Sequence, residues 1–247
     1  MSQSAEQVAV VTGHTQGLGA AIADALLAQR IHVLGIARQH NPDLAQRFGA
    51  ALTEVQLDFA DSQALERWLA SDALARFVAG SKLALLVNNA GVLEPIGPLE
   101  TQDIAAVSRA VTVNVGAVLM LSAAFAQATR QVADRRILHI SSGAASSAYA
   151  GWSVYGATKA ALDHHARAVQ LDHSPALRIC SVAPGVIDTE MQAEVRRTTE
   201  EKFPTRQRFV DMKREGKLRS PNEAARDAVD FLLSKGFGNT PVTDLRG

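Results

Sequence analysis

A glycine-rich turn between a strand pattern and a helix pattern is the feature that most constrains how this chain folds. Residues 8–12 read V-A-V-V-T, an apolar run rich in β-branched side chains, and residues 20–29 follow an alanine-rich helical pattern. In the turn G-H-T-Q-G-L-G, Gly13 permits a tight bend, Gly17 lets the backbone approach a ligand, and Gly19 lets the helix pack against the strand. Because a helix N-terminus offers unpaired N–H groups to an anion, the unit predicts a site for the pyrophosphate of a dinucleotide, with an ordinary glycine-rich turn as the alternative.

Strand and helix patterns continue to alternate along the chain. Runs typical of strands occur at Val8–Thr12, His32–Ala37, Leu52–Leu57, Leu83–Val87, Arg136–Ser141 and Leu177–Ala183, with a last short one near Thr240–Asp244. We therefore predict an α/β fold: a Rossmann-type, doubly wound, mainly parallel seven-stranded sheet with helices on both faces. A length of 247 residues fits one domain, residues 1–247, and no linker or repeat divides it.

One segment, residues 187–220, breaks this rhythm. It is charged, contains Met191 and Met212, and is interrupted by Pro204. We interpret it as two helical pieces that form a mobile lid over the substrate, because methionine suits an apolar wall that adapts to its ligand. A fixed surface excursion is the alternative.

A second constellation suits proton transfer. Tyr155 and Lys159 are four residues apart in S-V-Y-G-A-T-K, so on a helix they share a face. A free phenol has a pKa near 10, and we expect the Lys159 ammonium group to lower the pKa of Tyr155 toward the range of a working acid–base group. Ser142 closes the strand-like run R-I-L-H-I-S-S, where its hydroxyl can donate to a bound carbonyl. Taken alone, a Y-x-x-x-K pair is more often a surface pairing.

Six motifs together make the chain resemble a known family. They are T-G-x-x-x-G-x-G, N-N-A-G, a helical asparagine, I-S-S, Y-x-x-x-K and P-G, at 12–19, 88–91, Asn114, 140–142, 155–159 and 184–185. In this order and at this spacing they resemble the short-chain dehydrogenase/reductase family, in its compact single-domain type. The stretches N-N-A-G-V-L-E-P-I-G-P-L, S-S-G-A-A-S-S-A-Y-A-G-W-S-V-Y and A-P-G-V-I-D-T-E-M-Q resemble its sepiapterin-reductase-like and benzil-reductase-like branch.

The resemblance implies an NADP(H)-dependent oxidoreductase that transfers a hydride between a nicotinamide and a carbonyl or carbinol carbon. Tyr155 is expected to give or take the proton of the oxygen, and Lys159 to lower the pKa of Tyr155 and hold the nicotinamide ribose. Ser142 is expected to orient the carbonyl and stabilise charge on its oxygen. Asn114 is expected to interrupt its helix, with local backbone that holds a water in the proton path. These four residues are the expected catalytic set.

The cofactor site implied by the resemblance follows the ends of the strands. Its expected members are Gly13, Thr15, Gln16, Gly17, Leu18, Gly19, Arg38, Asp58, Asn89, Gly91, Tyr155, Lys159, Pro184, Gly185, Ile187 and Thr189. Arg38 follows the second strand, where NAD-binding units carry Asp or Glu, so it is expected to hold a 2′-phosphate and favour NADP(H) over NAD(H). Gln16 stands where many NADP-using relatives have a second basic residue, and His14 and His40 are candidates to assist Arg38.

That branch reduces ketones beside another carbonyl, often on aromatic compounds, which implies a ketone or α-diketone as the substrate. Glu94, Ala144, Trp152 and Met191 are the expected pocket residues, with simple core packing as the alternative for Trp152. Sepiapterin reductases use an acidic group at the extreme C-terminus, where this sequence has only Asp244 nearby. The alternatives are a non-catalytic NADP-binding regulatory protein and a reductase of another carbonyl class, 3-oxoacyl, sugar or pterin.

Composition argues against several classes of partner. Basic and acidic residues balance at 25 each, so neither nucleic acid nor a membrane is expected, and no apolar stretch is expected to reach the length of a membrane span. The single cysteine, Cys180, and a polar N-terminus without a signal-peptide pattern predict a cytoplasmic protein. By the resemblance, the apolar helices at 113–128 and through Tyr155 imply a homodimer or homotetramer. No metal site is expected, because the adjacent His164 and His165 point about 100° apart on a helix.

Overall fold

The computed structural model describes residues 6–174 and 176–246, and in this part of the chain seven strands form one sheet in the order β3–β2–β1–β4–β5–β6–β7. Every neighbouring pair of strands is parallel. The strands are β1 (Gln7–Thr12), β2 (His32–Ala37), β3 (Leu52–Gln56), β4 (Leu83–Asn88), β5 (Asp134–Ile140), β6 (Leu177–Ala183) and β7 (Val242–Asp244). The Rossmann-type prediction is confirmed, and the strand order reverses between β1 and β4, which places a ligand crevice at the carboxyl ends of these strands.

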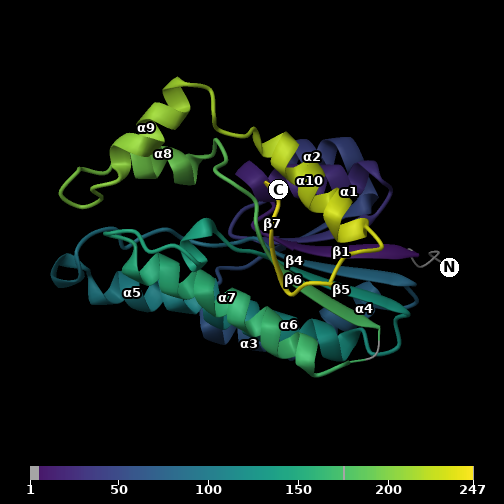
Figure 1. The fold of residues 1–247 in the computed structure, drawn as a ribbon. Coiled ribbons are helices and arrows are strands. Elements are labelled where there is room, and N and C mark those ends of the chain that lie inside the picture. The colour runs from purple at the N-terminus through teal and green to yellow at the C-terminus, as the bar shows by residue number, and fades with distance from the viewer. Residues whose placement is uncertain (1–5, 175, 247) are drawn as a thin grey trace.

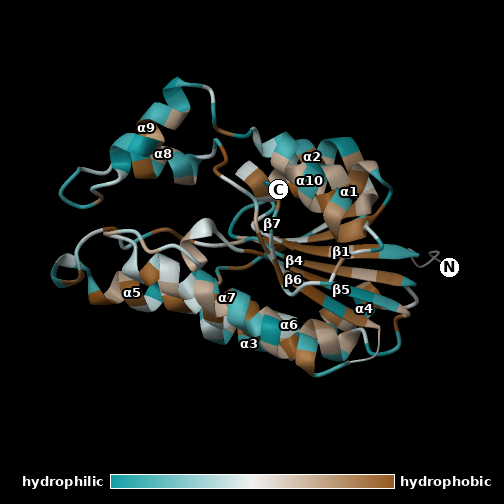
Figure 2. Ribbon diagram, in the orientation of Figure 1, coloured by the Kyte–Doolittle hydropathy of each residue, from teal (hydrophilic) through white to brown (hydrophobic). Residues whose placement is uncertain are grey.

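Helices cover both faces of the sheet (Figure 1). One face carries α1 (Gly17–Ala28), α2 (Pro42–Phe48) and α10 (Pro221–Leu233); the other carries α3 (Ser62–Leu69), α4 (Ala73–Val78), α5 (Ile104–Val111), α6 (Ala117–Ala128) and α7 (Ser153–Leu171). Alternate side chains of each strand enter the two cores: Ala9 and Val11 of β1 face α1 and α10, whereas Val8 and Val10 face the other layer. Figure 2 shows the strands as mostly hydrophobic, as expected for a parallel sheet buried on both faces.

Helices α5 and α6 join into one helical stretch through a π-helical turn, η3 (Thr112–Gly116), that contains Asn114. Over residues 104–128 this stretch is long and apolar enough to cross a membrane, with a mean hydropathy of 1.8 in its most apolar window. The expectation that no apolar stretch reaches this length is therefore wrong, because the helix begins well before the 113–128 segment considered in the sequence. A single helix of this kind is weak evidence for a membrane, and here Leu121 and Phe125 are fully buried in the core beneath the sheet.

The 187–220 segment leaves the sheet as a pair of helices. These are α8 (Glu190–Arg197) and α9 (Arg206–Arg214), with Pro204 between them, and Figure 1 shows both standing apart from the two layers. An isolated parallel bridge joins Ile187 to Arg219, with backbone hydrogen bonds from Asp188 N to Arg219 O and from Arg219 N to Val186 O. The two ends of the segment, at Ile187 and Arg219, therefore lie side by side. The predicted pair of helices is present, and its movement as a lid stays a prediction.

Short 3₁₀ turns complete the connections near the crevice. They are η1 (Gly49–Ala51), η2 (Leu99–Thr101) and η4 (Gly143–Ala145). The η4 turn begins directly after Ser142, whose hydroxyl accepts a hydrogen bond from the Ala144 backbone N–H at 3.1 Å. This local cap holds the Ser142 side chain at the end of β5, beside the start of α7.

Candidate active site

The glycine-rich turn has the geometry of an anion site. Gly13 and Gly17 adopt left-handed backbone conformations, with φ of 69° and 55°, which glycine adopts without steric cost. A Cβ on Gly19 would lie 2.1 Å from the Gly13 carbonyl oxygen, so only glycine allows this approach of α1 to β1. Gln16 precedes α1 without capping it through its side chain, so the first N–H groups of the helix stay available to a ligand.

The N-N-A-G segment is tied to this turn by side-chain hydrogen bonds. The Thr12 hydroxyl oxygen accepts from the backbone N–H groups of Asn89 and Ala90, both at 2.9 Å. The Asn89 amide nitrogen donates to the Thr12 carbonyl oxygen at 3.0 Å. Asn89 therefore fixes the ends of β1 and β4 to each other, in addition to lining the crevice where the resemblance placed it.

Ser142, Tyr155 and Lys159 meet in one cavity at the carboxyl ends of β4 and β5. Tyr155 and Lys159 occupy the N-terminal half of α7 and are 7% and 5% exposed. The Lys159 Nζ donates to the Ile140 carbonyl oxygen at 2.8 Å, across the end of β5. The shared helix face inferred from the i, i+4 spacing is thus present, and both side chains reach a largely buried site.

Burial dominates the titration of this pair. Burial raises the pKa of the Tyr155 phenol above its ordinary value, and a hydrogen bond with Ser142 offsets the rise in part. Burial lowers the pKa of Lys159 to about 8, against the attraction of Asp163. The expectation that the pKa of Tyr155 falls is therefore corrected: its net shift is upward because of burial, and the Lys159 Nζ lies 5.8 Å from the centre of the Tyr155 ring.

Asn114 is held firmly within its π-helical turn. Its Oδ1 accepts from the Val92 backbone N–H at 2.8 Å, and its Nδ2 donates to the Val92 carbonyl oxygen at 2.8 Å and to the Thr158 hydroxyl oxygen at 3.1 Å. The expected break in the helix is present at this residue. Its side chain joins the N-N-A-G segment to α7, a connecting role that the sequence did not reveal.

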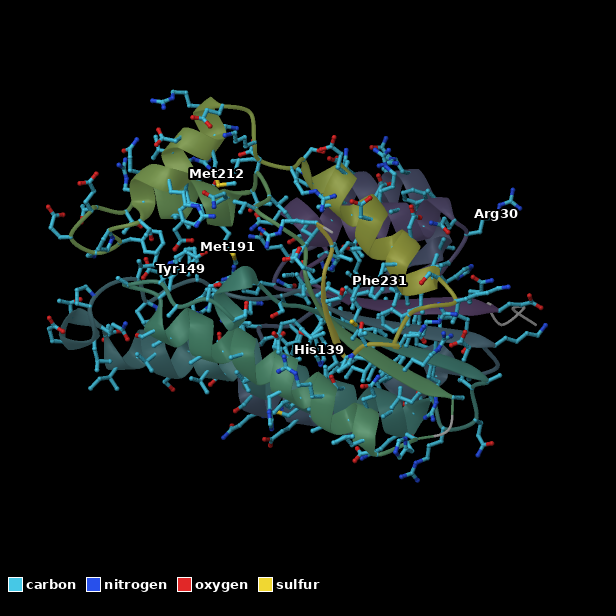
Figure 3. The ribbon with its side chains drawn as sticks, in the orientation of Figure 1. Arg30, His139, Tyr149, Met191, Met212 and Phe231 are labelled. Atoms are coloured by element: carbon cyan, nitrogen blue, oxygen red, sulfur yellow. The ribbon has the colours of Figure 1, made fainter. Side chains whose placement is uncertain are left out.

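The cavity encloses about 300 Å³ and has two chemically different ends. The cofactor end is lined by ten of the predicted residues, Gln16, Gly17, Leu18, Gly19, Asn89, Gly91, Pro184, Gly185, Ile187 and Thr189. The other end is lined mainly by apolar side chains, Leu93, Trp152, Val186, Met191 and Val195, with the polar Gln192 among them. Figure 3 shows Met191 and Tyr149 between the α8–α9 pair and the layer that contains α7. The cavity thus joins a polar anion site to an apolar pocket.

Trp152 is both a wall of this pocket and a packing residue. Its ring stacks on Phe203 at a centroid distance of 4.4 Å and meets Tyr155 edge-on at 5.4 Å. Phe203 lies between α8 and α9 and is fully buried, so Trp152 links the α8–α9 pair to Tyr155. Trp152 therefore both lines the pocket and packs in the core.

Two of the four expected substrate residues lie outside the cavity lining. The exposed Glu94 side chain accepts from the backbone N–H of the buried Ile96 at 2.8 Å, and Glu94 does not line the pocket. Ala144 is buried in the apolar cluster around Trp152 and Phe203 instead of facing the cavity. Neither residue lines the empty cavity, and their contact with a substrate stays a prediction.

The adenosine end of the crevice differs from the expectation in its histidines. His14 is completely buried, and its Nε2 pairs with the Glu54 Oε1 at 2.7 Å, so it packs beneath the turn and cannot reach a 2′-phosphate. Burial raises the pKa of Glu54. The hydrogen bonds from His14 and Asn41 outweigh this effect, so the pKa lies below its ordinary value. His40 lies 3.5 Å from the same carboxylate.

The remaining expected cofactor residues lie around the cavity without lining it. Arg38 is exposed at the end of β2, and its backbone oxygen accepts from the Gln56 side chain at 2.9 Å. Asp58 accepts from the Ala60 backbone N–H at 2.9 Å and lies 3.8 Å from the Arg109 guanidinium. Gly13 and Thr15 belong to the glycine turn and do not line the cavity. The Arg38 side chain is exposed, and its contact with a 2′-phosphate stays a prediction.

Gln192 is a polar pocket residue that sequence reasoning missed, as it missed the apolar Leu93, Val186 and Val195. It lies in the first half of α8, is 7% exposed, and lines the apolar end of the cavity. In the sequence it is one polar residue in the charged stretch E-M-Q-A-E, where nothing separates it from a solvated helix face. The fold alone brings it into the cavity.

Comparison with known proteins agrees with this geometry. Residues 7–200 match the family model described as short chain dehydrogenase. The chain is 33% identical over 236 residues to a benzil reductase, (S)-benzoin forming, from Bacillus cereus, which covers 92% of this chain and 94% of the relative. It is 29% identical to the sepiapterin reductase of Meriones unguiculatus, over 93% of this chain and 92% of the relative. A crystal structure of a short-chain dehydrogenase/reductase from Burkholderia vietnamiensis shares 50% identity over 99% of both chains, with a TM-score of 0.72.

The chain therefore belongs to the short-chain dehydrogenase/reductase family. It is an oxidoreductase that acts on a CH–OH or C=O group, and its relatives include the benzil and sepiapterin reductases of the branch inferred from its motifs. Because the family is enzymatic at this site, the alternative of a non-catalytic regulatory protein is not supported. Family membership implies a nicotinamide cofactor, and the uncapped N-terminus of α1, at the glycine turn that lines the cavity, fits its pyrophosphate.

Proposed function

We propose that this protein is an NADP(H)-dependent reductase of ketones or α-diketones, aromatic ones included. The observation that carries the proposal is the single cavity in which Ser142, Tyr155 and Lys159 face an apolar wall that contains Trp152 and Met191. An aromatic ketone needs both parts: a wall that removes its rings from water and hydroxyl groups that bind its oxygen. The similarity to benzil reductases supports the same substrate class.

In the proposed reaction, the residues of the chain bind and protonate the carbonyl oxygen. The nicotinamide, when bound, supplies the hydride chemistry at the carbonyl carbon. The Ser142 hydroxyl donates to the substrate oxygen and stabilises the negative charge that grows there. Tyr155 gives its proton to that oxygen, so that the carbonyl becomes an alcohol, and Lys159 stabilises the resulting phenolate. Burial keeps Tyr155 protonated until this step, which suits an acid in the reductive direction.

Arg38 supports the preference for NADP(H). It is a cation at the end of β2, where an acidic residue would bind the 2′-hydroxyl of NAD(H). A guanidinium holds a phosphate through paired charge-assisted hydrogen bonds. Gln16 adds no charge at the glycine turn, so the proposed selectivity rests on Arg38.

The α8–α9 pair is proposed to act as the substrate lid. Met191, Gln192 and Val195 of α8 line the cavity, so movement of this helix would open or close the apolar end. Figure 2 shows α8 and α9 as mainly hydrophilic on their visible surface, in keeping with a segment that is solvated in both positions. Closure would exclude water from the reacting carbonyl.

A homodimer or homotetramer is proposed from the outer layer of helices. Ile104 of α5 is 85% exposed and Leu171 of α7 is 74% exposed, and the stretch through α5 and α6 is strongly apolar. An exposed apolar helix layer of this kind suits contact with a second copy. The expected cytoplasmic location stays a prediction.

A pterin substrate has little support in the site. The expected acidic group, Asp244 at the end of β7, is paired with Arg246, whose Nε donates to its Oδ1 at 2.9 Å. Its carboxylate is therefore already bound close to its own strand. The 3-oxoacyl and sugar classes stay open as alternatives to be tested in the same assay.

A substrate panel tests the proposed function. Purified protein is assayed for NADPH and NADH oxidation with α-diketones, simple aryl ketones, quinones, aldehydes, 3-oxoacyl thioesters, keto sugars and pterins. We expect the highest kcat/KM with an aromatic α-diketone and NADPH. Preferred turnover of an acyl thioester or a sugar would overturn the proposed substrate class.

A further inference from the structure

Gln192 places one buried polar group in a wall that is mainly apolar; Glu190 also lines the cavity, but it is exposed and its carboxylate pairs with Arg197. The wall around Gln192 consists of Leu93, Trp152, Val186, Met191 and Val195. Ser142 and Tyr155 line the same cavity and supply the hydroxyl groups for one substrate oxygen. A buried amide is costly unless it forms hydrogen bonds, so its presence in this wall needs a partner.

Arg196 fixes the orientation of the Gln192 amide. The Arg196 Nη1 donates to the Gln192 Oε1 at 3.1 Å, one turn along α8. A guanidinium has donors and no acceptor, so the amide oxygen must face Arg196 and the amide nitrogen must face the other way. Arg196 is itself held in place, because its carboxylate neighbour Asp188 lies 3.7 Å away and its backbone oxygen accepts from the Arg206 Nε at 2.8 Å.

The side-chain amide nitrogen of Gln192 carries two N–H groups that can donate hydrogen bonds. Within residues 6–174 and 176–246 no protein group accepts a hydrogen bond from its Nε2. This nitrogen is not one of the fully buried polar atoms that lack a partner, so it keeps some accessible surface. Gln192 as a whole is 93% buried, since its relative exposure is 7%, and it lines the cavity. The two N–H groups are therefore available to a molecule in the cavity.

We propose that the Gln192 Nε2 donates a hydrogen bond to a second substrate oxygen, on the carbon next to the reacting carbonyl. Gln192 is then the residue that selects α-diketones and α-hydroxy ketones over ketones that have a methylene at that position. This inference rests on the proposed function, because it names the group that recognises the substrate class. A site built to hydrogen-bond an oxygen rejects the analogue without it far more strongly than an apolar wall rejects a change of shape.

The test compares two substrates that differ in that oxygen alone. Benzil has two adjacent carbonyls between its phenyl rings, and deoxybenzoin has one carbonyl and a methylene. The kcat/KM of each is measured with NADPH for the wild-type protein, Gln192→Glu, Gln192→Met and the control Gln63→Glu. Glutamate keeps the shape of Gln192 and can still accept from Arg196, but it replaces the amide nitrogen with an oxygen that cannot donate when ionised. Gln63 is exposed on α3, so its substitution makes the same charge change away from the cavity.

In the wild-type protein and in Gln63→Glu we expect kcat/KM to favour benzil. In Gln192→Glu and Gln192→Met we expect the benzil-to-deoxybenzoin ratio to fall by about tenfold or more, the scale of one hydrogen bond. A ratio that stays at the wild-type value, or parallel losses with both substrates, would overturn the role of Gln192 and leave it as a packing residue. Failure of the wild-type protein to reduce either ketone would instead overturn the proposed function and the inference with it. NADPH binding and thermal unfolding of each variant confirm that the fold is kept.

Discussion

The Asn114 amide nitrogen donates to the Thr158 hydroxyl oxygen at 3.1 Å, and the Thr158 hydroxyl in turn donates to the Tyr155 carbonyl oxygen at 2.8 Å. The π-helical turn is thus bonded to the turn of α7 that lies between Tyr155 and Lys159. Since Asn114 also binds both backbone groups of Val92, one side chain fixes the N-N-A-G segment relative to α7.

Substitution of Asn114 by alanine is expected to destabilise the protein and slow the reaction together. It leaves the Val92 N–H and C=O without their buried partner, at a cost of about 1–3 kcal/mol for each unsatisfied group. Urea unfolding should show this loss, and kcat should fall. Asn222→Ala, on the exposed first turn of α10, is the control and should change neither quantity. Full stability in Asn114→Ala would contradict the connecting role.

Tyr155→Phe is expected to lower kcat by at least about a hundredfold, the scale of general acid–base catalysis. The phenol is the proton donor of the proposed reaction, whereas the ring still packs against Trp152. NADPH binding, measured by fluorescence titration, should persist. The chain has one other tyrosine, Tyr149, so Tyr149→Phe is a matched control that should keep most of its turnover. Near-normal turnover in Tyr155→Phe would refute the assignment.

Arg38→Ala is expected to weaken NADPH binding by about 1.5–3 kcal/mol, the range for hydrogen bonds to a charged group. NADH lacks the 2′-phosphate, so its binding should hardly change. Titration of both cofactors with the wild-type protein, Arg38→Ala and the surface variant Arg67→Ala measures the difference. Equal losses for NADPH and NADH in Arg38→Ala would show that the arginine does not bind the phosphate.

Hydrogen exchange is expected to distinguish α8 and α9 from the sheet. The aromatic cluster of Trp152, Phe203 and Phe209 holds this pair of helices against the rest of the protein, whereas β1 and β4 lie in the centre of the sheet. Without ligands, amides of α9 should exchange faster than those of β4, and NADPH with a ketone analogue should slow them. Equal protection of α9 and β4 that neither ligand alters would indicate a fixed surface element.

His139 is expected to make stability fall in mild acid. It is fully buried on β5 between Asn88 and His165, and burial, together with the charges of His165 and Lys159, lowers its pKa from 6.5 to about 3. Between these values the unfolded chain binds a proton that the folded protein does not, so stability is lost as pH falls below about 6.5. The slope from this group is at most about 1.4 kcal/mol per pH unit.

Urea unfolding from pH 7 to pH 5 measures this slope. We expect His139→Gln to flatten the loss of stability, because glutamine has no charge to gain in the unfolded chain. His32→Gln, at the exposed start of β2, removes a histidine that is solvated in both states and should leave the slope as it is. Equal slopes in the wild-type protein and His139→Gln would contradict the burial argument.

Much of the fold was predictable because its signals are local. The apolar runs and the glycine turn predicted each strand to within two residues at its ends, since parallel strands buried on both faces are almost continuously apolar. The positions of Ser142, Tyr155 and Lys159 followed from spacing on one strand end and one helix. Such features depend on the chain within a few residues of each group.

The parts that were missed depend on how distant segments meet. Gln192 enters the cavity because α8 lies beside the residues that follow the ends of β4 and β5, which no local pattern in E-M-Q-A-E indicates. Glu94 was expected in the pocket from its place after N-N-A-G, whereas its carboxylate accepts from the Ile96 backbone N–H and does not line the empty cavity. The pKa of Tyr155 was expected to fall, because spacing reveals a neighbouring charge and does not reveal the burial that opposes it.

The bridge between Ile187 and Arg219 bears on how such a protein acquires new specificities. Because the two ends of the α8–α9 segment are already clamped together, its length and sequence can change with little effect on the sheet beneath. Doubling the length of a closed loop costs only about 0.6 kcal/mol. Evolution, or a protein engineer, can therefore treat residues 190–218 as an exchangeable cassette, grafted at a fixed junction beside Ser142, Tyr155 and Lys159, provided that an aromatic residue still packs on Trp152.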